Sequence, residues 1–157
     1  MRMILAGGLA MALASCGGGD ADDGASGGTY QRTTEVGDEG GEMVSRAGGD
    51  IEVELPSGIT VYPGAQVLAT NAVTLPEGKG QTVFMQTQDP VTEVAEFYRK
   101  QASDLGIVFS NEMKSGDTQL LSGKAPSGTG MDMMVASNEE GTTIQLTVSR
   151  QASSEGY

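Results

Sequence analysis

The stretch DPVTEVAEFYRKQASDLG, residues 89–106, decides the fold because it is the clearest structural element in the chain. Asp89 is a preferred N-cap residue, Pro90 suits the first helical position, and Gly106 suits the C-terminal cap. On a helical wheel the apolar residues form one stripe about 100° wide. The stripe consists of Val91, Val94, Ala95, Tyr98, Ala102 and Leu105. The sequence therefore predicts one amphipathic helix over about residues 90–105 that packs on a sheet and faces water on its other side.

Short apolar alternations, broken by turn residues, surround this segment on both sides. Their period of two predicts strands. The connections are too short for parallel crossovers, so the strands should pair mainly antiparallel. The runs are IEVEL (51–55), GITVY (58–62), VLATNAVTL (67–75), QTVFMQT (81–87), GIVFSNEM (106–113), TQLLSG (118–123), MDMMVAS (131–137) and TTIQLTVS (142–149). We therefore expect an α+β fold in which a mainly antiparallel sheet of about five to six strands carries the helix on one face.

The hydrophobic core should be mainly aliphatic, because aromatic residues make up only 4% of the chain. Its large anchors are expected to be Phe84, Phe97, Tyr98 and Phe109. A domain of about 100 residues buries roughly two-thirds of its unfolded surface. Residues 51–150 are therefore long enough for one domain with an ordinary core.

The first residues of the chain resemble a bacterial export signal. In MRMILAGGLAMALAS (1–15), Arg2 precedes an uncharged run that is too short to span a bilayer but fits a signal peptide. The only cysteine, Cys16, follows within LASC (13–16), which resembles the lipobox of bacterial lipoproteins. This resemblance implies that residues 1–15 are removed and that Cys16 carries fatty acyl chains as a membrane anchor. Gly17 is similar to the residue at this position in outer-membrane lipoproteins, which implies the outer membrane, facing the periplasm, in a Gram-negative cell.

Residues 16–50 are rich in glycine and acidic residues and show no apolar periodicity. Such a segment buries too little surface to offset its ordering entropy. We therefore expect a disordered acidic tether between Cys16 and the domain. A short flexible tail is expected at the other end, over residues 151–157.

The composition argues against several function classes. Nine Lys and Arg against 21 Asp and Glu give a formal charge of −12, which repels nucleic acid. The chain has no histidine and one cysteine, so a disulfide, a CxxC site and a histidine general base are excluded. The glycine–lysine pairs at 78–79 and 123–124 lack the spacing of a phosphate-binding loop. We expect neither catalysis nor a cofactor, and we assign no catalytic residue.

The methionines offer one alternative to a purely structural reading. Met131 and Met133 share a strand face with Val135, and Met85 and Met113 lie on other expected strands. Thioethers bind Cu(I), so these four methionines are a candidate copper site. Methionine is also a flexible core filler, and Val135 on the same face favours that role.

A second resemblance covers about residues 59–110. VYPGA (61–65), a strand ending in FMQTQDP, and VAEFYRKQASDLG (94–106) are similar to small α+β domains of uncharacterised bacterial lipoproteins and secreted proteins. No reaction is attached to that family. We expect a non-catalytic binding module for an envelope protein or a cell-wall component, acting through the VYPGA turn or the sheet face away from the helix. A small-ligand or Cu(I) binder and an enzyme of unrecognised type are the alternatives.

Overall fold

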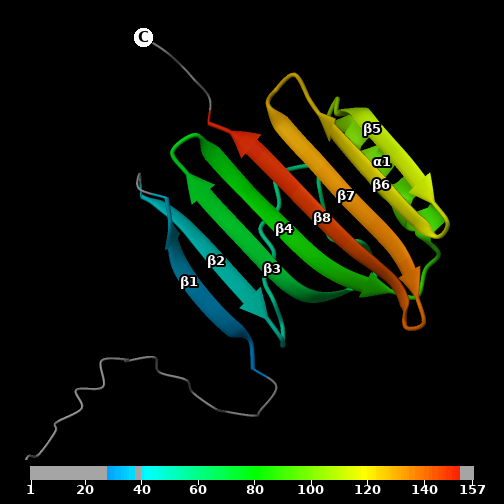
Figure 1. Ribbon diagram of the computed structural model, residues 1–157, viewed down its shortest axis with the longest axis horizontal. Coiled ribbons are helices and arrows are strands. Elements are labelled where there is room, and N and C mark those ends of the chain that lie inside the picture. Colours follow the sequence, from blue (N-terminus) through cyan, green and yellow to red (C-terminus); the bar gives the residue numbers. More distant parts are fainter. Residues whose placement is uncertain (1–27, 38–39, 153–157) are drawn as a thin grey trace, which may run out of the picture.

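Eight strands and one helix make up the computed structural model, which describes residues 28–37 and 40–152 (Figure 1). The elements are β1 (Tyr30–Val36), β2 (Gly41–Ala47), β3 (Gln66–Leu75), β4 (Gly78–Thr87), α1 (Val91–Asp104), β5 (Val108–Ser115), β6 (Thr118–Lys124), β7 (Thr129–Asn138) and β8 (Gly141–Gln151). The strands form one sheet in the order β1-β2-β3-β4-β8-β7-β6-β5, and every neighbouring pair is antiparallel. The predicted α+β class, antiparallel pairing and amphipathic helix are confirmed.

The sheet has eight strands rather than the expected five to six, and two of the additional strands are β1 and β2 at one edge. Both lie within residues 16–50, so the expected disorder is wrong for residues 30–36 and 41–47. Nearly all of their side chains are exposed or half-buried. These strands arise from backbone hydrogen bonding to the edge of β3, and not from an apolar face, so no apolar alternation marks them in the sequence. The predicted signal peptide (1–15), the predicted anchor Cys16 and the expected tail residues 153–157 lie outside the described residues.

The helix α1 begins and ends close to the predicted residues. Pro90 occupies the N-cap position without a side-chain cap, so the expectation that Asp89 caps the helix is wrong. At the other end, Gly106 has φ 68°, and the N–H of Ile107 donates to the carbonyl of Ala102 at 2.8 Å. The N–H of Gly106 also donates to the carbonyl of Ser103. These two bonds form a Schellman cap, which favours glycine because the residue must adopt a positive φ. No helix in the described part of the chain is long and apolar enough to cross a membrane.

The apolar stripe of α1 packs on one face of the sheet, mainly against β7 and β6. Val94, Ala95, Tyr98 and Ala102 are buried, as the periodicity predicts. Under them lie the inward residues of the strands, and the most deeply buried are Val83, Met85, Met131, Val135, Ile144, Leu146 and Val148. We call this side of the sheet the covered face and the opposite side the open face.

The predicted aromatic anchors differ in their positions. Tyr98 is fully buried, and Phe97 and Phe109 are half-buried against the core. The expectation for Phe84 is wrong, because it lies on the open face between Gln145 of β8 and Ala69 of β3. Its neighbours Val83 and Met85 point into the core instead, as strand alternation requires.

An irregular segment, residues 48–65, crosses the covered face beside α1 and packs against the core there; in Figure 1 it passes behind the sheet. The strands predicted at 51–55 and 58–62 are therefore wrong as secondary structure. Their alternation is nevertheless correct, because Ile51, Val53 and Leu55 are half-buried while Glu52 and Glu54 are exposed. We call residues 51–58 the strap.

Candidate functional site

A crevice of about 280 Å³ lies between the strap and the covered face of the sheet, and we call it the strap crevice. The strap contributes Glu54, Leu55 and Pro56. The sheet contributes Ala72, Val73, Thr74, Lys79, Gly80, Gln81, Val148 and Arg150 from strands β3, β4 and β8. An adjoining hollow of similar size shares Pro56 and Arg150 and continues towards the end of α1 at Leu105. The crevice therefore combines apolar walls with charged groups, which is the usual composition of a small-molecule site.

Two cations lie side by side at this crevice. Lys79 of β4 and Arg150 of β8 are directly opposite each other in the antiparallel register. Among the described residues, neither forms an ion pair; the ion pairs found are Arg99–Glu112 and Lys100–Asp104. Like charges directly opposite each other on one sheet face are destabilising. This pair therefore reduces the stability of the empty fold.

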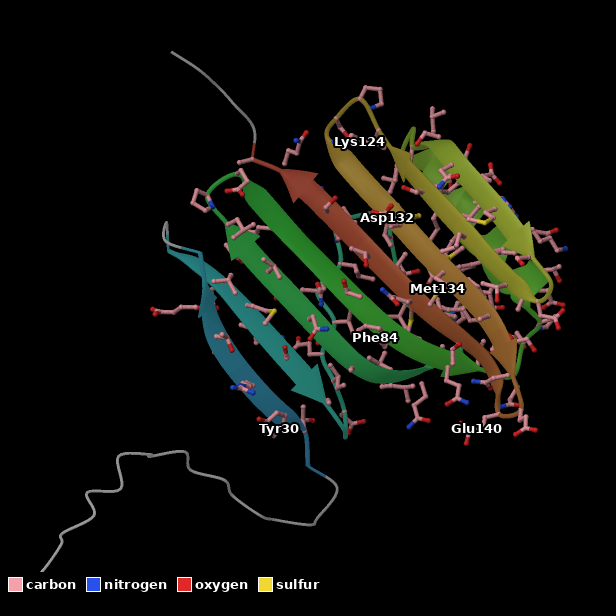
Figure 2. All side chains as sticks on the ribbon, in the orientation of Figure 1. Tyr30, Phe84, Lys124, Asp132, Met134 and Glu140 are labelled. Carbon is pink, nitrogen blue, oxygen red and sulfur yellow. The ribbon has the colours of Figure 1, made fainter. Side chains whose placement is uncertain are left out.

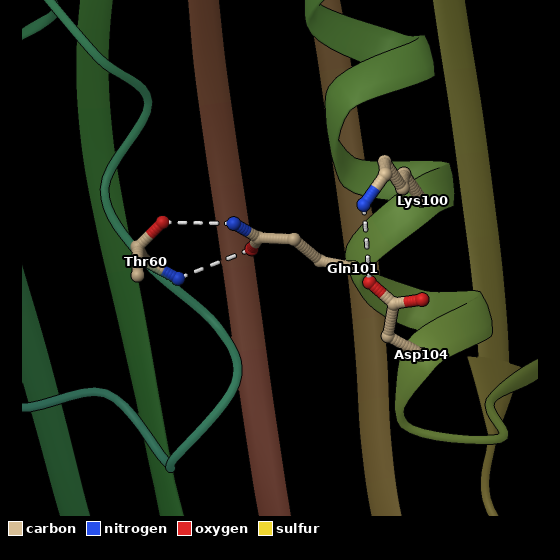
Figure 3. Close-up of polar contacts among 4 residues, drawn as sticks. All are labelled: Thr60, Lys100, Gln101 and Asp104. Atoms are coloured by element: carbon tan, nitrogen blue, oxygen red, sulfur yellow. Dashed lines mark hydrogen bonds and ion pairs between the residues drawn. The ribbon is translucent and has the colours of Figure 1, made fainter.

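The strap packs against the core through Val53 and Leu55, and its hydrogen bonds to the rest of the protein lie at its two ends. Before it, the N–H of Gly48 donates to the carbonyl of Leu68 at 3.4 Å. After it, the side-chain amide of Gln101 on α1 clasps Thr60: Gln101 Nε2 donates to Thr60 Oγ1 at 2.8 Å, and the N–H of Thr60 donates to Gln101 Oε1 at 3.1 Å (Figure 3). Between these points, within the described structure, the backbone of residues 51–58 makes no hydrogen bond with the sheet. The strap can thus move away from the sheet without breaking a β ladder.

One glycine fixes the path of the strap over the helix end. Gly58 has φ 94°, and a Cβ at this position would come 2.6 Å from Cδ2 of Leu105. The positive φ therefore favours glycine, and a Cβ at this position would also force the side chain of Leu105 to shift. The strap is consequently closely packed at this end while its middle covers the crevice.

No described element covers the open face, which Figure 2 shows from the front. Two neighbouring rows of side chains in the middle of this face differ in composition. The apolar row follows the register through Tyr30, Ala47, Ala69, Phe84, Gln145, Met134, Leu120 and Met113. The polar row beside it runs through Arg32, Ser45, Asn71, Thr82, Thr147, Asp132, Ser122 and Asn111. A shallow hollow of about 230 Å³ lies on both rows between β5 and β8.

The polar row contains hydrogen bonds between its own members. Thr82 and Thr147 are linked hydroxyl to hydroxyl at 2.9 Å, and Ser122 donates to Asp132. In the apolar row, Met134 and Met113 are 40% and 52% exposed. The sheet face away from the helix, one of the two surfaces expected to bind a partner, is thus uncovered by any described element and carries few charged side chains.

The structure divides the four candidate copper ligands between the two faces. Met85, Met131 and Met133 are almost completely buried in the core, whereas Met113 is exposed in the apolar row. Met113 therefore cannot join the other three sulfurs around one ion. Met85 has a packing role, since its Sδ accepts a hydrogen bond from the hydroxyl of Tyr98 at 3.9 Å. Among the described residues there is also no cluster of three or more His, Cys, Asp or Glu side chains that could hold a metal.

The VYPGA turn (61–65) has a structural role next to α1. The N–H of Ala65 donates to the carbonyl of Tyr62 at 3.1 Å, and Gly64 has φ 76°. The Tyr62 ring packs edge-on against Phe97, with ring centres 5.1 Å apart, and next to Tyr98. Burial, and then the neighbouring Asp89 carboxylate, raise the pKa of Tyr62 to about 12, and burial also raises the pKa of Tyr98.

The sequence did not reveal Lys79 and Arg150 as functional candidates. Lys79 sits in a Gly-Lys-Gly stretch that fails the phosphate-loop pattern, and Arg150 stands near the end of the expected domain. The two residues are far apart in the chain, and only the β4–β8 register brings them together. No local pattern in the sequence could have shown this pairing.

The START domain-like family model matches residues 67–156, which is more than half of the chain. This range contains β3 to β8 and α1, and therefore the sheet side of the strap crevice. It begins after the strap and excludes β1 and β2. Comparison with curated proteins and with solved structures gave no significant match.

Proposed function

Because this chain belongs to the START domain-like family, we propose that it is a non-catalytic ligand-binding module that holds a small ligand in the strap crevice. One observation carries this proposal: the strap covers a crevice of about 280 Å³ yet has no backbone hydrogen bonds to the sheet below it. A cover of this kind gives access without unfolding the sheet. The size is close to the lower end of common small-molecule sites, so the ligand is small.

The walls of the crevice determine how such a ligand would be held. Val148 and Leu55 offer apolar contact from opposite sides, and Ala72 leaves space because its side chain is short. Burial of apolar ligand surface supplies most of the binding free energy in sites of this type. Polar groups at the rim then orient the ligand. The proposed binding role requires only these apolar and polar contacts and no catalytic side chain.

The location we propose for this module is a bacterial membrane surface. The lipobox-like LASC supports an acyl anchor on Cys16, with the domain in the periplasm if the cell is Gram-negative. Cys16 precedes Tyr30, the first residue of β1, by 14 positions, so the sheet can lie at most about 50 Å from the anchor. An envelope protein or a cell-wall component is the proposed partner of the anchored domain. Nucleic acid is not, because of the strongly negative net charge.

The ligand-site proposal can be tested with the neutral fluorophore phenylnaphthylamine, using the full chain with Cys16→Ser to remove the proposed acylation. Ala72→Leu adds a larger side chain to the floor of the crevice and should weaken probe binding about tenfold or more. The matched control is Ala69→Leu, which makes the same change on the open face of β3 and should leave the affinity unchanged. Unaltered binding by Ala72→Leu would contradict the proposal.

The anchor proposal has a separate test in cells. Cys16→Ser should release the protein from membrane fractions or leave the precursor uncleaved. Normal fractionation of a chain of mature length would contradict an acyl anchor at Cys16. Crosslinking of the anchored and unanchored forms would then show whether a partner is captured only at the membrane.

A further inference from the structure

The strap crevice contains a concentration of positive charge that is unusual for this molecule. The chain has nine Lys and Arg against 21 Asp and Glu, yet two of these cations are direct cross-strand neighbours. Both line the crevice, and no carboxylate within 4.0 Å neutralises either of them among the described residues. Both side chains are exposed, so water screens part of their repulsion, and a negative group bound between them would relieve the rest.

Building on the proposed function, we infer that the strap crevice is an anion site, in which Lys79 and Arg150 together bind the carboxylate, sulfonate or phosphate group of a small organic monoanion. The geometry suits one acidic group, because opposite residues in an antiparallel pair have Cβ atoms about 5 Å apart. The planar guanidinium of Arg150 can donate two parallel hydrogen bonds to such a group. The ammonium of Lys79 supplies a second charge from the adjacent strand.

The charge of the ligand follows from the charged residues that line the crevice. Within the strap crevice Lys79 and Arg150 contribute two positive charges and Glu54 contributes one negative charge, which leaves +1; Glu77 lines an adjoining hollow that the same two cations share. A monoanion neutralises this site, whereas a dianion adds charge to a chain that already carries −12. Glu54 also makes the strap itself electrostatically attracted to the cation pair. An acidic ligand group and the strap carboxylate are thus alternatives for the same cations.

The apolar walls of the crevice indicate that the rest of the ligand is apolar. Val148 is 1% exposed and forms the floor next to Arg150, and Leu55 of the strap faces it. A small aliphatic or aromatic group therefore lies between sheet and strap while the acidic group remains at the cations. The overall negative charge of the protein repels free anions from most of its surface, so recognition depends on this local pair.

The test compares two fluorescent probes that differ in one acidic group. Anilinonaphthalene sulfonate (ANS) is phenylnaphthylamine with an added sulfonate. Lys79→Gln and Arg150→Gln should each weaken ANS binding about threefold to fivefold, and the double variant about tenfold or more. Binding of phenylnaphthylamine should change less than about twofold in all of them. Raising the salt concentration should weaken ANS binding to the natural chain and have little effect on the double variant.

The matched control is Lys124→Gln, which removes one positive charge at the far edge of the open face, visible in Figure 2. It should leave the affinity for both probes unchanged. Because Lys79 and Arg150 repel each other, their variants should melt at or above the temperature of the natural chain, so lost binding cannot come from unfolding.

The outcomes separate this inference from the proposed function. If ANS binding is blocked by Ala72→Leu but is insensitive to Lys79→Gln and Arg150→Gln, the anion inference alone is overturned. If neither probe binds in a manner that depends on Ala72, the proposed ligand site fails and this inference fails with it. ANS binding that depends on both cations, with phenylnaphthylamine unaffected, supports both.

Discussion

The covered face and the open face belong to the same strands but use their side chains for different purposes. On β4 and β8 the covered face presents Val83, Met85, Ile144 and Leu146, all at most 1% exposed. The alternate residues on the open face are Thr82, Phe84, Gln145 and Thr147, which remain half-buried at most. Stability therefore comes mainly from one side of the sheet. Residues on the other side are freer to serve contacts with water or a partner.

The largest expected difference between the two faces concerns a buried charge. Val94→Asp places a carboxylate on the apolar side of α1, at a position with 0% exposure, and should unfold the domain. Burying an unpaired charge costs several kcal/mol, which is a large part of the stability of a typical domain. Circular dichroism during urea titration measures this effect. Met134→Asp on the open face is the control, because its side chain is 40% exposed and should change the unfolding free energy by less than about 1 kcal/mol.

A second prediction compares two adjacent residues of β4. Met85→Ala should lower the free energy of unfolding by about 2–5 kcal/mol, because it leaves a cavity in the core under Tyr98. Phe84→Ala removes a larger side chain from the open face and should lower it by only about 1 kcal/mol. Chemical denaturation of both variants measures the two losses of unfolding free energy, which can then be compared. An equal or greater loss for Phe84→Ala would mean that the open face is covered by something in solution.

The sequence predicts the covered face better than it predicts the sheet edge. Helix α1 could be predicted from its C-terminal glycine and its apolar stripe, because Val94, Tyr98 and Ala102 recur with helical period and all are buried. The Phe84 error came from ranking a side chain by size when strand alternation between Val83 and Met85 already placed it outside. Edge strands β1 and β2 bury little, so the pattern that reveals buried strands is absent from them.

The candidate site was the least predictable part of the molecule. The period of Ile51, Val53 and Leu55 correctly showed which side chains of the strap face the sheet. The same period could not show that the strap lacks hydrogen-bonded partners, since alternation reports burial and not pairing. The cation pair of Lys79 and Arg150 depends on the register between two distant strands, and register is a property of the whole sheet.

A third prediction concerns pH and the aromatic cluster of the covered face. The pKa of Tyr62 is about 12 in the folded protein and about 10 in the unfolded chain, mainly because of burial. The protonated phenol therefore favours folding: this contribution is complete below pH 10 and is lost as the pH rises from 10 to 12. We expect the unfolding free energy to fall by about 2 kcal/mol over that interval. Urea titrations at several alkaline pH values measure the fall.

Two tyrosine variants test the origin of this pH dependence. Tyr62→Phe should make the alkaline profile less steep, because one of two buried titrating groups is removed while the ring contact with Phe97 is kept. Tyr98, whose pKa burial also raises, should leave a residual slope in that variant. Tyr30→Phe, at a 63% exposed position of the apolar row, should leave the profile as it is. A profile that Tyr62→Phe does not alter would show that this phenol is not protected in the folded state.

The smallest expected effect on stability comes from the two hydrogen bonds between Gln101 and Thr60. It is also the effect most specific for the strap. Gln101→Ala removes both hydrogen bonds to Thr60 at an exposed site and should lower the unfolding free energy by only about 1 kcal/mol. Amide hydrogen exchange should become faster at Ile59 and Thr60, whose N–H groups donate to Pro56 and to Gln101, while β4 and β8 remain protected. Lys100→Ala, one position earlier, removes only the exposed contact with Asp104 and should leave exchange at these two residues unchanged. If Gln101→Ala accelerates exchange equally at these two residues and in β8, the strap does not open independently, and the covered face is a single cooperative unit up to its edge.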